Sequence, residues 1–477
     1  MINFSFIRST DKEKIVGHIK ISKGLDIPIK GEPVGDPTEL IPSGHANVQA
    51  PFCIALNLSC FSDVKFRVLV KEEDHVKIGQ PLAEDKECPG RLFVAPAAGT
   101  IREIRRGLKR RLLDIIIQVD SHEEIDKHSI ISLEEMSRAE IIEKLKLGGL
   151  FTHIRQRPFN LIANPNNVPR SIFIKALESA PFTPPSEMQV TGYEKEFQEG
   201  LNTLKRLTEG PVHLIYKKGS TFSPFINAQG VEKHTAEGPY PISNVSIHIE
   251  KLDPIYSVDD VIWTLDAHTV VAIGYFLLHG SYFTPRIVSV AGPGIVDGKT
   301  GYFRVREGFP ISNLIAGRLK NEFIRIISGN VLTGHQVTAE DFLGYEDTCI
   351  SVVPENTKRK FLHFFRLNSD SYTKSGAYLS AHLNSKNSRY DFSTNQHGEE
   401  RPFIDATMYD EVMPLKIATM PLVKAVLAED FDLAAKLGLL EVDGEDFALP
   451  TFVCPSKIEM VEIINNGLKK YAQDTLK

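Results

Sequence analysis

Two neighbouring stretches of the N-terminal region decide its fold: VKEEDHVKIGQPL at Val70–Leu82 and RLFVAPAAGTI at Arg91–Ile101. In both stretches apolar residues alternate with polar ones over short runs. Three glycines interrupt these runs: Gly79, Gly90 and Gly99. Such alternation, broken by glycine, predicts short strands joined by turns. The Ile-rich stretch Leu112–Val119 (LLDIIIQV) predicts the strand that closes this unit.

The composition limits the class of protein. The chain has 477 residues, of which 42% are hydrophobic and 24% charged, an ordinary globular balance. This excludes a largely disordered chain, a collagen and a disulfide miniprotein. At roughly 150 residues per domain, about three domains are expected. The net charge of −6 argues against a general nucleic-acid binder.

The sequence gives no sign of a membrane span or of a disulfide framework. A spanning helix needs about 20 mostly apolar residues, whereas the longest apolar run here is Val270–Leu278. The first residues carry the charged stretch Asp11–Lys14 and no apolar core, so we expect no secretory signal. The cysteines are scattered, which indicates a reducing cytoplasm. They are Cys53, Cys60, Cys88, Cys349 and Cys454.

Beyond the N-terminal unit the pattern changes to alternating strands and helices. A helix is expected to start at Ser132, with Glu135 completing a capping box, and to end at Gly148. The segments that follow are the strand Ser171–Ala176, the helix Tyr193–Leu207 and the strand Val212–Tyr216. This alternation predicts an α/β layer with a largely parallel sheet.

The region from about 266 to 400 is expected to be rich in strands. The predicted strands are Val270–Ala272, Arg286–Val290, Tyr302–Val305, Ile350–Val353 and Phe361–Phe365. The Ser/Asn-rich stretch Ser369–Asn395 predicts a long loop. Helices are expected after Met413. They are Leu422–Leu427, Phe431–Leu437 and Ile458–Tyr471, the last with a capping box of Ser456 and Glu459.

The stretch Gly292–Thr300 (GPGIVDGKT) is similar to nucleotide-binding loops only superficially. Its spacing fits neither the P-loop nor the dinucleotide fingerprint. A phosphate cradle also needs backbone N–H donors and a following helix, but Pro293 has no N–H and Gly301–Val305 predicts a strand. We therefore expect a turn between two strands.

Lys86 ends the stretch LAEDK, and an Asp-Lys pair at a hairpin tip is how lipoyl-carrying domains present their modified lysine. One interpretation is a swinging-arm carrier. The other is a barrel of the same shape with an ordinary surface lysine. Cys88, Pro89 and Gly90 lengthen the tip and favour the second interpretation.

The densest basic run lies around Gly107 and consists of Arg102, Arg105, Arg106, Lys109, Arg110 and Arg111. Such a run is usually a solvated hairpin. It could instead face anionic lipid headgroups or an acidic partner, because each basic residue near a charged membrane gains about 1 kcal/mol.

Catalytic motifs are not evident in the sequence. The 15 histidines are dispersed, with no HExxH motif and no His/Cys pair at zinc spacing, and no GxSxG elbow occurs. Lone His and Asp residues are therefore interpreted as structural. We assign no catalytic, cofactor-binding or metal-binding residue, and the sequence offers no self-sufficient active site.

A series of short blocks, in a fixed order, connects the chain to a known family. The blocks are Ile21–Pro33, the VKxGQxL…EDK…PG…APAAGTI stretch, Arg155–Phe159, Tyr216–Ser220, Gly238–Pro241, Ser328–Gly334, Val412–Leu415 and Thr451–Lys457. Each block alone is weak, but together they resemble the A subunits of the bacterial sodium-translocating NADH:quinone oxidoreductases. The resemblance extends from about Ile21 to Tyr471.

The resemblance implies a fold related to the flavin-binding subunit of respiratory complex I and the C subunit of the Rnf complex. The implied domains are a lipoyl-like β-barrel with an N-terminal extension (1–125), a Rossmann-like α/β layer (126–265), a ubiquitin-like β-grasp with a strand-rich region (266–405) and a C-terminal helical domain (406–477).

Two departures from the complex I relative bear on cofactors. The glycine-rich loop that binds flavin and NADH there corresponds to Gly148–Thr152 here, and only Cys454-Pro455 of the cluster motif remains. One thiolate cannot hold a cluster that takes four. The resemblance therefore implies a peripheral subunit without a cofactor, on the cytoplasmic face of the inner membrane. It would be associated with quinone, with NADH, flavins and iron–sulfur centres in partner subunits. The alternatives are a stand-alone soluble NADH–flavin dehydrogenase and a carrier lipoylated at Lys86.

Overall fold

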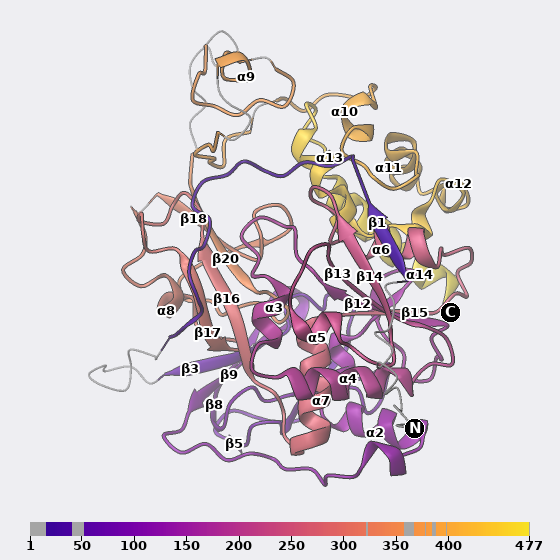
Figure 1. Ribbon diagram of the computed structural model, residues 1–477. Coiled ribbons are helices and arrows are strands. Elements are labelled where there is room, and N and C mark those ends of the chain that lie inside the picture. Colours follow the sequence, from indigo (N-terminus) through magenta and orange to yellow (C-terminus); the bar gives the residue numbers. More distant parts are fainter. Residues whose placement is uncertain are drawn as a thin grey trace, which may run out of the picture.

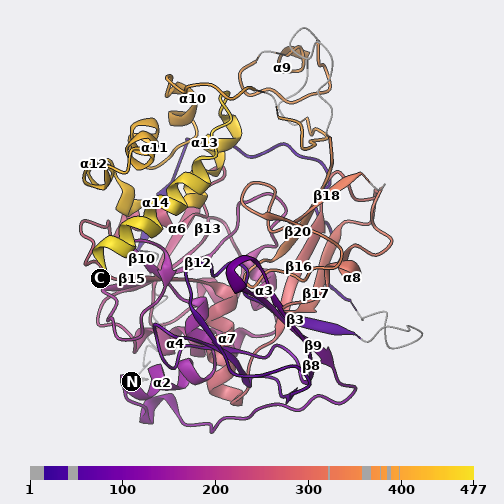
Figure 2. The same cartoon turned by 180° about the vertical axis from the view of Figure 1, so that it is seen from behind.

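A computed structural model describes residues 16–40, 52–320, 323–356, 367–376, 378–383, 388–396 and 398–476. Figure 1 and the reverse view in Figure 2 show the strands within residues 53–119 at the bottom of the molecule and the C-terminal helices at its top. An α/β layer and a second large sheet stand side by side between them. Within the described residues no helix has the length and apolar character needed to cross a bilayer.

The N-terminal unit consists of two small sheets around one apolar core. One has the order β3-β9-β8-β5 and the other β4-β6-β7. The strands are β3 (Cys53–Asn57), β4 (Phe66–Val68), β5 (His75–Val76), β6 (Pro81–Asp85), β7 (Leu92–Val94), β8 (Gly99–Arg106) and β9 (Leu112–Val119). The predicted strand Leu112–Val119 is confirmed. Ile115 and Ile117 pack inside with Phe93.

A seven-stranded sheet forms the α/β layer in the order β1-β14-β13-β12-β15-β10-β11. The first five of these strands are parallel, as predicted, and β10 and β11 are antiparallel. The strands are β1 (Gly17–Lys20), β10 (Arg155–Arg157), β11 (Leu161–Ile162), β12 (Ser171–Ala176), β13 (Val212–Lys217), β14 (Glu232–Glu237) and β15 (Ile262–Asp266). β1 comes from the N-terminal segment, which therefore crosses the molecule before the barrel begins.

Helices cover both faces of this sheet. They are α2 (Arg138–Leu147), α3 (Ser186–Val190), α4 (Glu194–Lys205), α5 (Ser223–Ile226), α6 (Val245–Leu252) and α7 (Ala267–His279). Leu201 of α4 and Val270 of α7 pack with Ile174 on one face, whereas Ile247 of α6 packs with Phe173 on the other.

Two local predictions in this layer are wrong. Val270–Ala272 lies inside α7, because the helix is buried on nearly all sides and so shows no helical periodicity. The capping box of α2 is formed by Ser137 and Glu140, whereas Ser132 precedes a short 3₁₀ turn and makes no side-chain cap. Both serines have an acidic residue three positions later, so spacing alone did not separate them.

A six-stranded sheet stands beside the α/β layer in the order β19-β18-β20-β16-β17-β2. Its strands are β2 (Thr38–Glu39), β16 (Pro285–Ala291), β17 (Gly301–Arg306), β18 (Ile324–Ser328), β19 (His335–Val337) and β20 (Cys349–Pro354), and α8 (Ile311–Ile315) follows β17. Gly292–Thr300 joins the antiparallel strands β16 and β17, which confirms the predicted turn. The predicted strand Phe361–Phe365 lies outside the described residues.

The C-terminal part contains α10 (Thr407–Asp410), α11 (Thr419–Leu427), α12 (Phe431–Lys436), α13 (Ala448–Val453) and α14 (Met460–Thr475). In the described part of the loop predicted at Ser369–Asn395, one short helix occurs, α9 (Ser380–Leu383). The capping box predicted at Ser456 and Glu459 is wrong. Ser456 is buried, Glu459 makes no side-chain cap, and the Met460 N–H is bonded by the Thr451 hydroxyl at 3.1 Å.

Candidate functional site

A polar cleft of about 190 Å³ lies at the carboxyl ends of β12 and β15. Open parallel α/β sheets bind ligands outside the carboxyl ends of their strands, which makes this cleft the first candidate site. Lys175 of β12 and Asp266 of β15 reach it from the sheet, and Glu178 and His268 reach it from the segments that follow these strands.

The polar side chains of the cleft already have partners within the protein. Lys175 Nζ lies 2.8 Å from a carboxylate oxygen of Glu178. Asp266 accepts a hydrogen bond of 2.8 Å from the Thr269 N–H and so caps α7. His268 Nε2 donates to the Pro285 carbonyl at 2.9 Å.

Burial sets the protonation of these groups. It lowers the pKa of His268 to about 4, so this imidazole is neutral at physiological pH. Burial also opposes the charge on Lys175, but Glu178 and Glu445 outweigh it and raise the lysine pKa. For Glu445, burial and then Asp443 raise the carboxyl pKa to about 8. The cleft thus holds a charged lysine beside a carboxyl group that keeps its proton at neutral pH.

The size of the polar cleft restricts its chemistry. Small-molecule sites usually have about 300 to 1,000 Å³, and the cleft has about 190 Å³. It suits internal charge pairing or exchange of protons better than binding of a dinucleotide.

Gly148 and Gly149, in the expected Gly148–Thr152 loop, allow neighbouring parts of the protein to pack closely against this loop. A Cβ on Gly148 would lie 2.7 Å from the ring of Phe276 in α7, and one on Gly149 would lie 3.0 Å from Val94 of the barrel. The Thr152 hydroxyl is bonded to the Gly149 carbonyl and to the Tyr345 hydroxyl, each at 2.6 Å. Both glycines therefore allow close contact between this loop, α7 and the barrel.

Cys454 is fully buried, with its thiol 3.2 Å from the Tyr409 hydroxyl. Among the described residues, the one group of three or more potential metal ligands contains no cysteine. The residue left over from the cluster motif is thus part of the hydrophobic core of the C-terminal helices.

Lys86 lies at the tip of the hairpin between β6 and β7 and is exposed. Glu84 below it accepts bonds from the Gly90 N–H and from Arg67, and these bonds fix the lengthened tip. The hairpin placement agrees with the sequence interpretation. The absence of a modification at Lys86 stays a prediction.

The basic run forms a second hairpin, between β8 and β9, which we call the basic hairpin (residues 102–111). Leu108 at its tip is 93% exposed. Arg105 contacts Asp114 and Asp341, at 3.8 and 3.7 Å, and lies over the Phe342 ring. Among the described residues, Arg106, Lys109 and Arg110 have no acidic partner, so three cations surround an exposed leucine.

The sequence did not predict a larger apolar cavity of about 620 Å³. Aromatic and aliphatic side chains dominate its wall, and Arg325 and Lys457 add positive charge. The Tyr372 and Phe452 rings stack there at 6.2 Å. Other apolar lining residues are Ile27, Ile29, Ile327, Val353 and Phe392. These residues come from distant segments, one of them the Ser/Asn-rich stretch, so no local pattern could reveal the cavity.

Family models match most of the chain. The NqrA N-terminal barrel-sandwich hybrid domain matches residues 19–120, the NqrA second alpha/beta domain residues 136–282 and the NQRA C-terminal domain residues 287–339. A chain of an NAD⁺-reducing NiFe-hydrogenase in the H₂-reduced state aligns with a TM-score of 0.37 and 14% identity, covering 71% of this chain and 61% of that one. A TM-score and identity this low do not establish a shared fold or function.

The fold and its sites define a multidomain α/β protein that begins with a barrel-sandwich hybrid domain. The chain is 36% identical to the A subunit of the Na(+)-translocating NADH-quinone reductase of Chlamydia caviae over 465 residues, covering 96% of this chain and 97% of the relative. For the Yersinia pestis protein of the same name, identity is 36% over 459 residues, covering 96% and 100%. The chain therefore belongs to the family of the A subunits of Na(+)-translocating NADH-quinone reductases.

Proposed function

We propose that this chain is a peripheral subunit of a sodium-translocating NADH:quinone oxidoreductase and takes part in quinone reduction without a flavin or iron–sulfur cluster of its own. The observation that carries the proposal is the similarity over 96% of the chain to relatives that are A subunits of such reductases. Partner subunits would bind NADH, flavins and iron–sulfur centres. The complex would sit in the bacterial inner membrane, with this chain on the cytoplasmic face.

We also propose the domain division at about residues 125, 265 and 405. The five parallel strands support a Rossmann-like layer, the mixed six-stranded sheet a β-grasp-like unit, and the run from α10 to α14 a helical domain. Residues 17–39 belong to none of these units alone, because β1 pairs with β14 and β2 with β17.

For the quinone we propose the apolar cavity. Its volume of about 620 Å³ lies within the usual range for small ligands, and its stacked aromatic wall suits a flat apolar ring with an oxygen that can accept a bond from Lys457. Phe392→Ala and Phe452→Ala should each weaken binding of a short-chain ubiquinone at least tenfold in equilibrium dialysis. Phe431→Ala, on α12 and outside the cavity, is the control. Unchanged binding in both cavity variants would refute this site.

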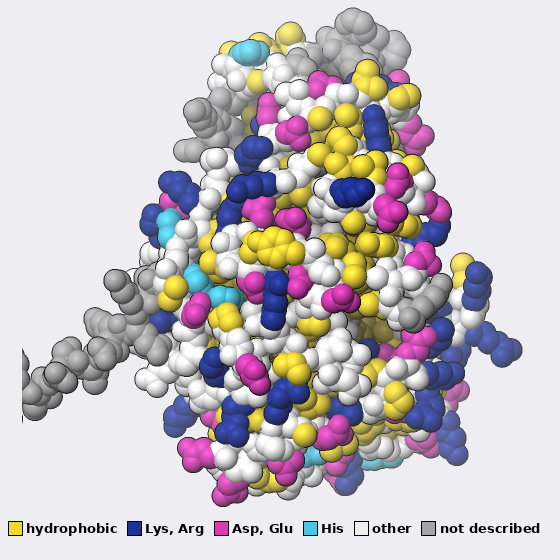
Figure 3. All heavy atoms as spheres, turned by 90° about the vertical axis from the view of Figure 1, so that its right-hand side faces the viewer, with side chains coloured by type: hydrophobic (Ala, Val, Ile, Leu, Met, Phe, Trp, Pro, Cys, Tyr) yellow, Lys and Arg dark blue, Asp and Glu magenta, His cyan; other side chains and the backbone are white. Residues whose placement is uncertain are grey.

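Attachment to the membrane complex can use either of two surfaces. One is the basic hairpin. The other lies on the side of α11 and α12, where Figure 3 shows hydrophobic atoms gathered over the upper half of the view. Leu427 and Leu433 of these helices are 53% and 45% exposed. A rise in salt weakens the first kind of contact and leaves the second intact.

The proposal as a whole is tested on the purified full-length chain. We expect a colourless protein whose intact mass equals the sequence mass and which binds to membranes that contain the other subunits. Stoichiometric flavin or iron would favour the stand-alone dehydrogenase. A lipoyl mass on the peptide with Lys86 would favour the carrier.

A further inference from the structure

Three potential metal ligands lie together near the amino ends of β13 and β14, the edge of the sheet opposite the polar cleft. The two strands are parallel neighbours (Figure 1), with His213 paired to Glu232 and Ile215 to His234. Because side chains alternate between the faces of a strand, His213, Glu232 and His234 all project from the same face. We call these residues the histidine group.

The facing atoms of the histidine group have the separations of a metal site. His213 Nδ1 lies 3.0 Å from His234 Nε2 and 3.3 Å from a Glu232 carboxylate oxygen, and His234 Nε2 lies 3.9 Å from that oxygen. Zinc bonds of about 2.0 Å in a tetrahedron put neighbouring ligand atoms about 3.3 Å apart. The three atoms thus form one face of such a tetrahedron before any ion is added.

The histidine group is buried on the side of its two imidazoles and open to solvent at Glu232. The His213 and His234 side chains are only 5% and 2% exposed, whereas that of Glu232 is 46% exposed and opens to solvent. A neutral imidazole can bind a metal through the facing nitrogen, which both histidines turn toward Glu232. With one carboxylate, the ligand set carries a charge of −1.

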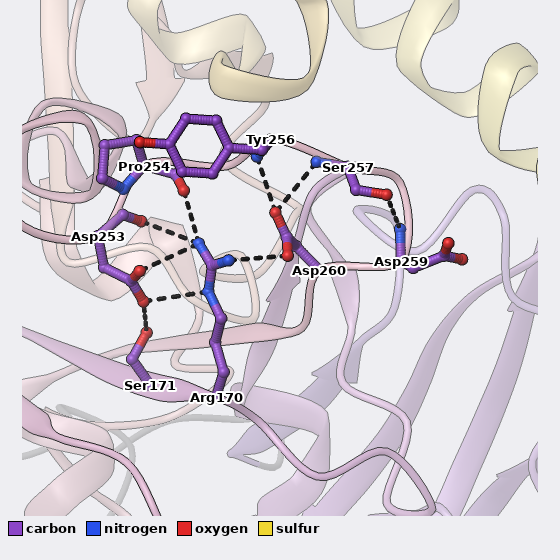
Figure 4. Close-up of polar contacts among 8 residues, drawn as sticks. All are labelled: Arg170, Ser171, Asp253, Pro254, Tyr256, Ser257, Asp259 and Asp260. Carbon is purple, nitrogen blue, oxygen red and sulfur yellow. Dashed lines mark hydrogen bonds and ion pairs between the residues drawn. The ribbon is translucent and has the colours of Figure 1, made fainter.

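A further carboxylate is held close to this site. Arg170, which precedes β12, binds Asp253 and Asp260, and Ser171 donates to Asp253 at 2.5 Å (Figure 4). The Tyr256 N–H donates to Asp260 at 2.7 Å, which fixes the loop over the strand ends. Asp253 is near enough to His213 to act on it electrostatically. Because Arg170 already pairs with Asp253, this carboxylate offers a cation beside His213 only part of its negative charge.

We propose that His213, His234 and Glu232 bind a divalent transition-metal ion, zinc in the first place, with water in the remaining position. The same geometry without metal is a hydrogen-bonded histidine pair, in which one facing nitrogen keeps a proton. Two neutral imidazoles and one carboxylate are a ligand set that zinc takes in proteins, and they do not suit Mg²⁺ or Ca²⁺, which prefer oxygen.

The surroundings also set the expected strength of binding. Among the described residues, the outer nitrogens His213 Nε2 and His234 Nδ1 have no hydrogen-bond partner. Metal-binding histidines usually donate that N–H to an acceptor, and loss of the acceptor lowers metal affinity about 10- to 100-fold. We therefore expect a reversible site that saturates at one zinc per chain and that a chelator empties without unfolding the protein.

The test uses the full-length chain, stripped with EDTA and dialysed against Zn²⁺ alone. We expect one zinc per chain by elemental analysis and a melting temperature that rises with zinc concentration. Glu232→Gln and His213→Gln should each weaken the site at least tenfold. His18→Gln is the matched control, because His18 lies on the adjacent strand β1 and is hydrogen-bonded to Thr235 instead. Co²⁺ in place of zinc should give the intense visible absorption of four-coordinate cobalt.

Glu232→Gln is the ligand variant least expected to disturb folding, because the Glu232 side chain is half-exposed and glutamine has the same size and shape. Circular dichroism of the metal-free variants checks the fold. Binding of less than one zinc by the wild-type chain would overturn the proposal. So would equal zinc binding by wild type and both ligand variants, which would mean adventitious ions only.

Discussion

Neutralising the tip of the basic hairpin should release the chain from anionic membranes. The variant replaces Arg106, Lys109 and Arg110 with Gln. These side chains are exposed, and no described acidic residue pairs with them. Arg105 is left in place because it contacts Asp114, whose pKa burial already raises to about 6, and its loss would leave that carboxyl without its cation.

The expected change in membrane partitioning follows from the number of unpaired charges that the variant removes. Each basic residue near an anionic surface contributes about 1 kcal/mol, so three contribute about 3 kcal/mol, roughly a 100-fold change in partitioning at low salt. Leu108, 93% exposed between these cations, can add apolar contact with the lipid. Exposed charges are screened over about 8 Å at physiological salt and about 3 Å at 1 M, so wild-type binding itself should weaken across this range.

The assay is sedimentation with vesicles of neutral lipid, with and without 30% anionic lipid, over a salt series. The matched control replaces Lys71, Lys127 and Lys195 with Gln, which removes the same net charge from exposed positions elsewhere. The control should partition like wild type. If the hairpin variant stays within twofold of wild type, or if wild type ignores anionic lipid, the headgroup hypothesis is wrong. Attachment through the apolar surface of α11 and α12 then remains.

Two further predictions concern the α/β layer and the polar cleft. Gly274→Ala should lower the melting temperature, because the new Cβ would lie 1.8 Å from the Glu196 carbonyl of α4. Such overpacking costs about 1 to 3 kcal/mol of stability. At an exposed position in a helix, the same change would instead stabilise the protein by up to about 1 kcal/mol. Asn202→Ala on the exposed side of α4 is the control, and a higher melting temperature for Gly274→Ala would contradict the close packing. Burial raises the pKa of Glu445 to about 8, so its stabilising effect is complete below about pH 4.5 and is lost as pH rises toward 8. Glu445→Gln, which stays neutral, should therefore become more stable relative to wild type between pH 5 and pH 8, and a difference that does not change with pH would count against the shifted pKa.

The sequence predicted those elements whose own residues show the apolar pattern of a buried strand. Ser171–Ala176 and Leu112–Val119 are short apolar runs rich in β-branched residues, and both form strands with the predicted bounds. The same criterion failed at Val270–Ala272, where an equally apolar run forms part of a helix. Asp266 and Gly280 cap the two ends of this helix, and Val270 packs closely against the backbone of Gly200 in α4.

The polar cleft, the apolar cavity and the histidine group were harder to predict than the two hairpins, because none of these three sites is local in sequence. The histidine group joins residues about 20 positions apart through the register of two parallel strands, so no fixed motif spacing describes it. The capping boxes show the same limit at shorter range. Ser132 and Ser137 have equivalent spacing to an acidic residue, but only Ser137 caps α2, whereas Ser132 precedes a 3₁₀ turn.

The carboxyl and amino ends of the parallel strands form two edges of the sheet, and these edges differ in which existing contacts a bound ligand would have to break. At the carboxyl edge, a ligand would separate Lys175 from Glu178. It would also disturb the hydrogen bond from Asn244 to Asp446, which connects the C-terminal helices to this edge. Removing one partner of a buried charge pair costs several kcal/mol, so opening the polar cleft is unfavourable unless another protein of the complex replaces these contacts. At the amino edge, the half-exposed Glu232 opens the histidine group to solvent, and a metal ion would replace the hydrogen bond between His213 and His234 with its own bonds to both nitrogens. The basic hairpin is equally accessible. Binding is therefore expected first at these accessible surfaces and only second at the carboxyl edge, where related α/β folds hold their nucleotides.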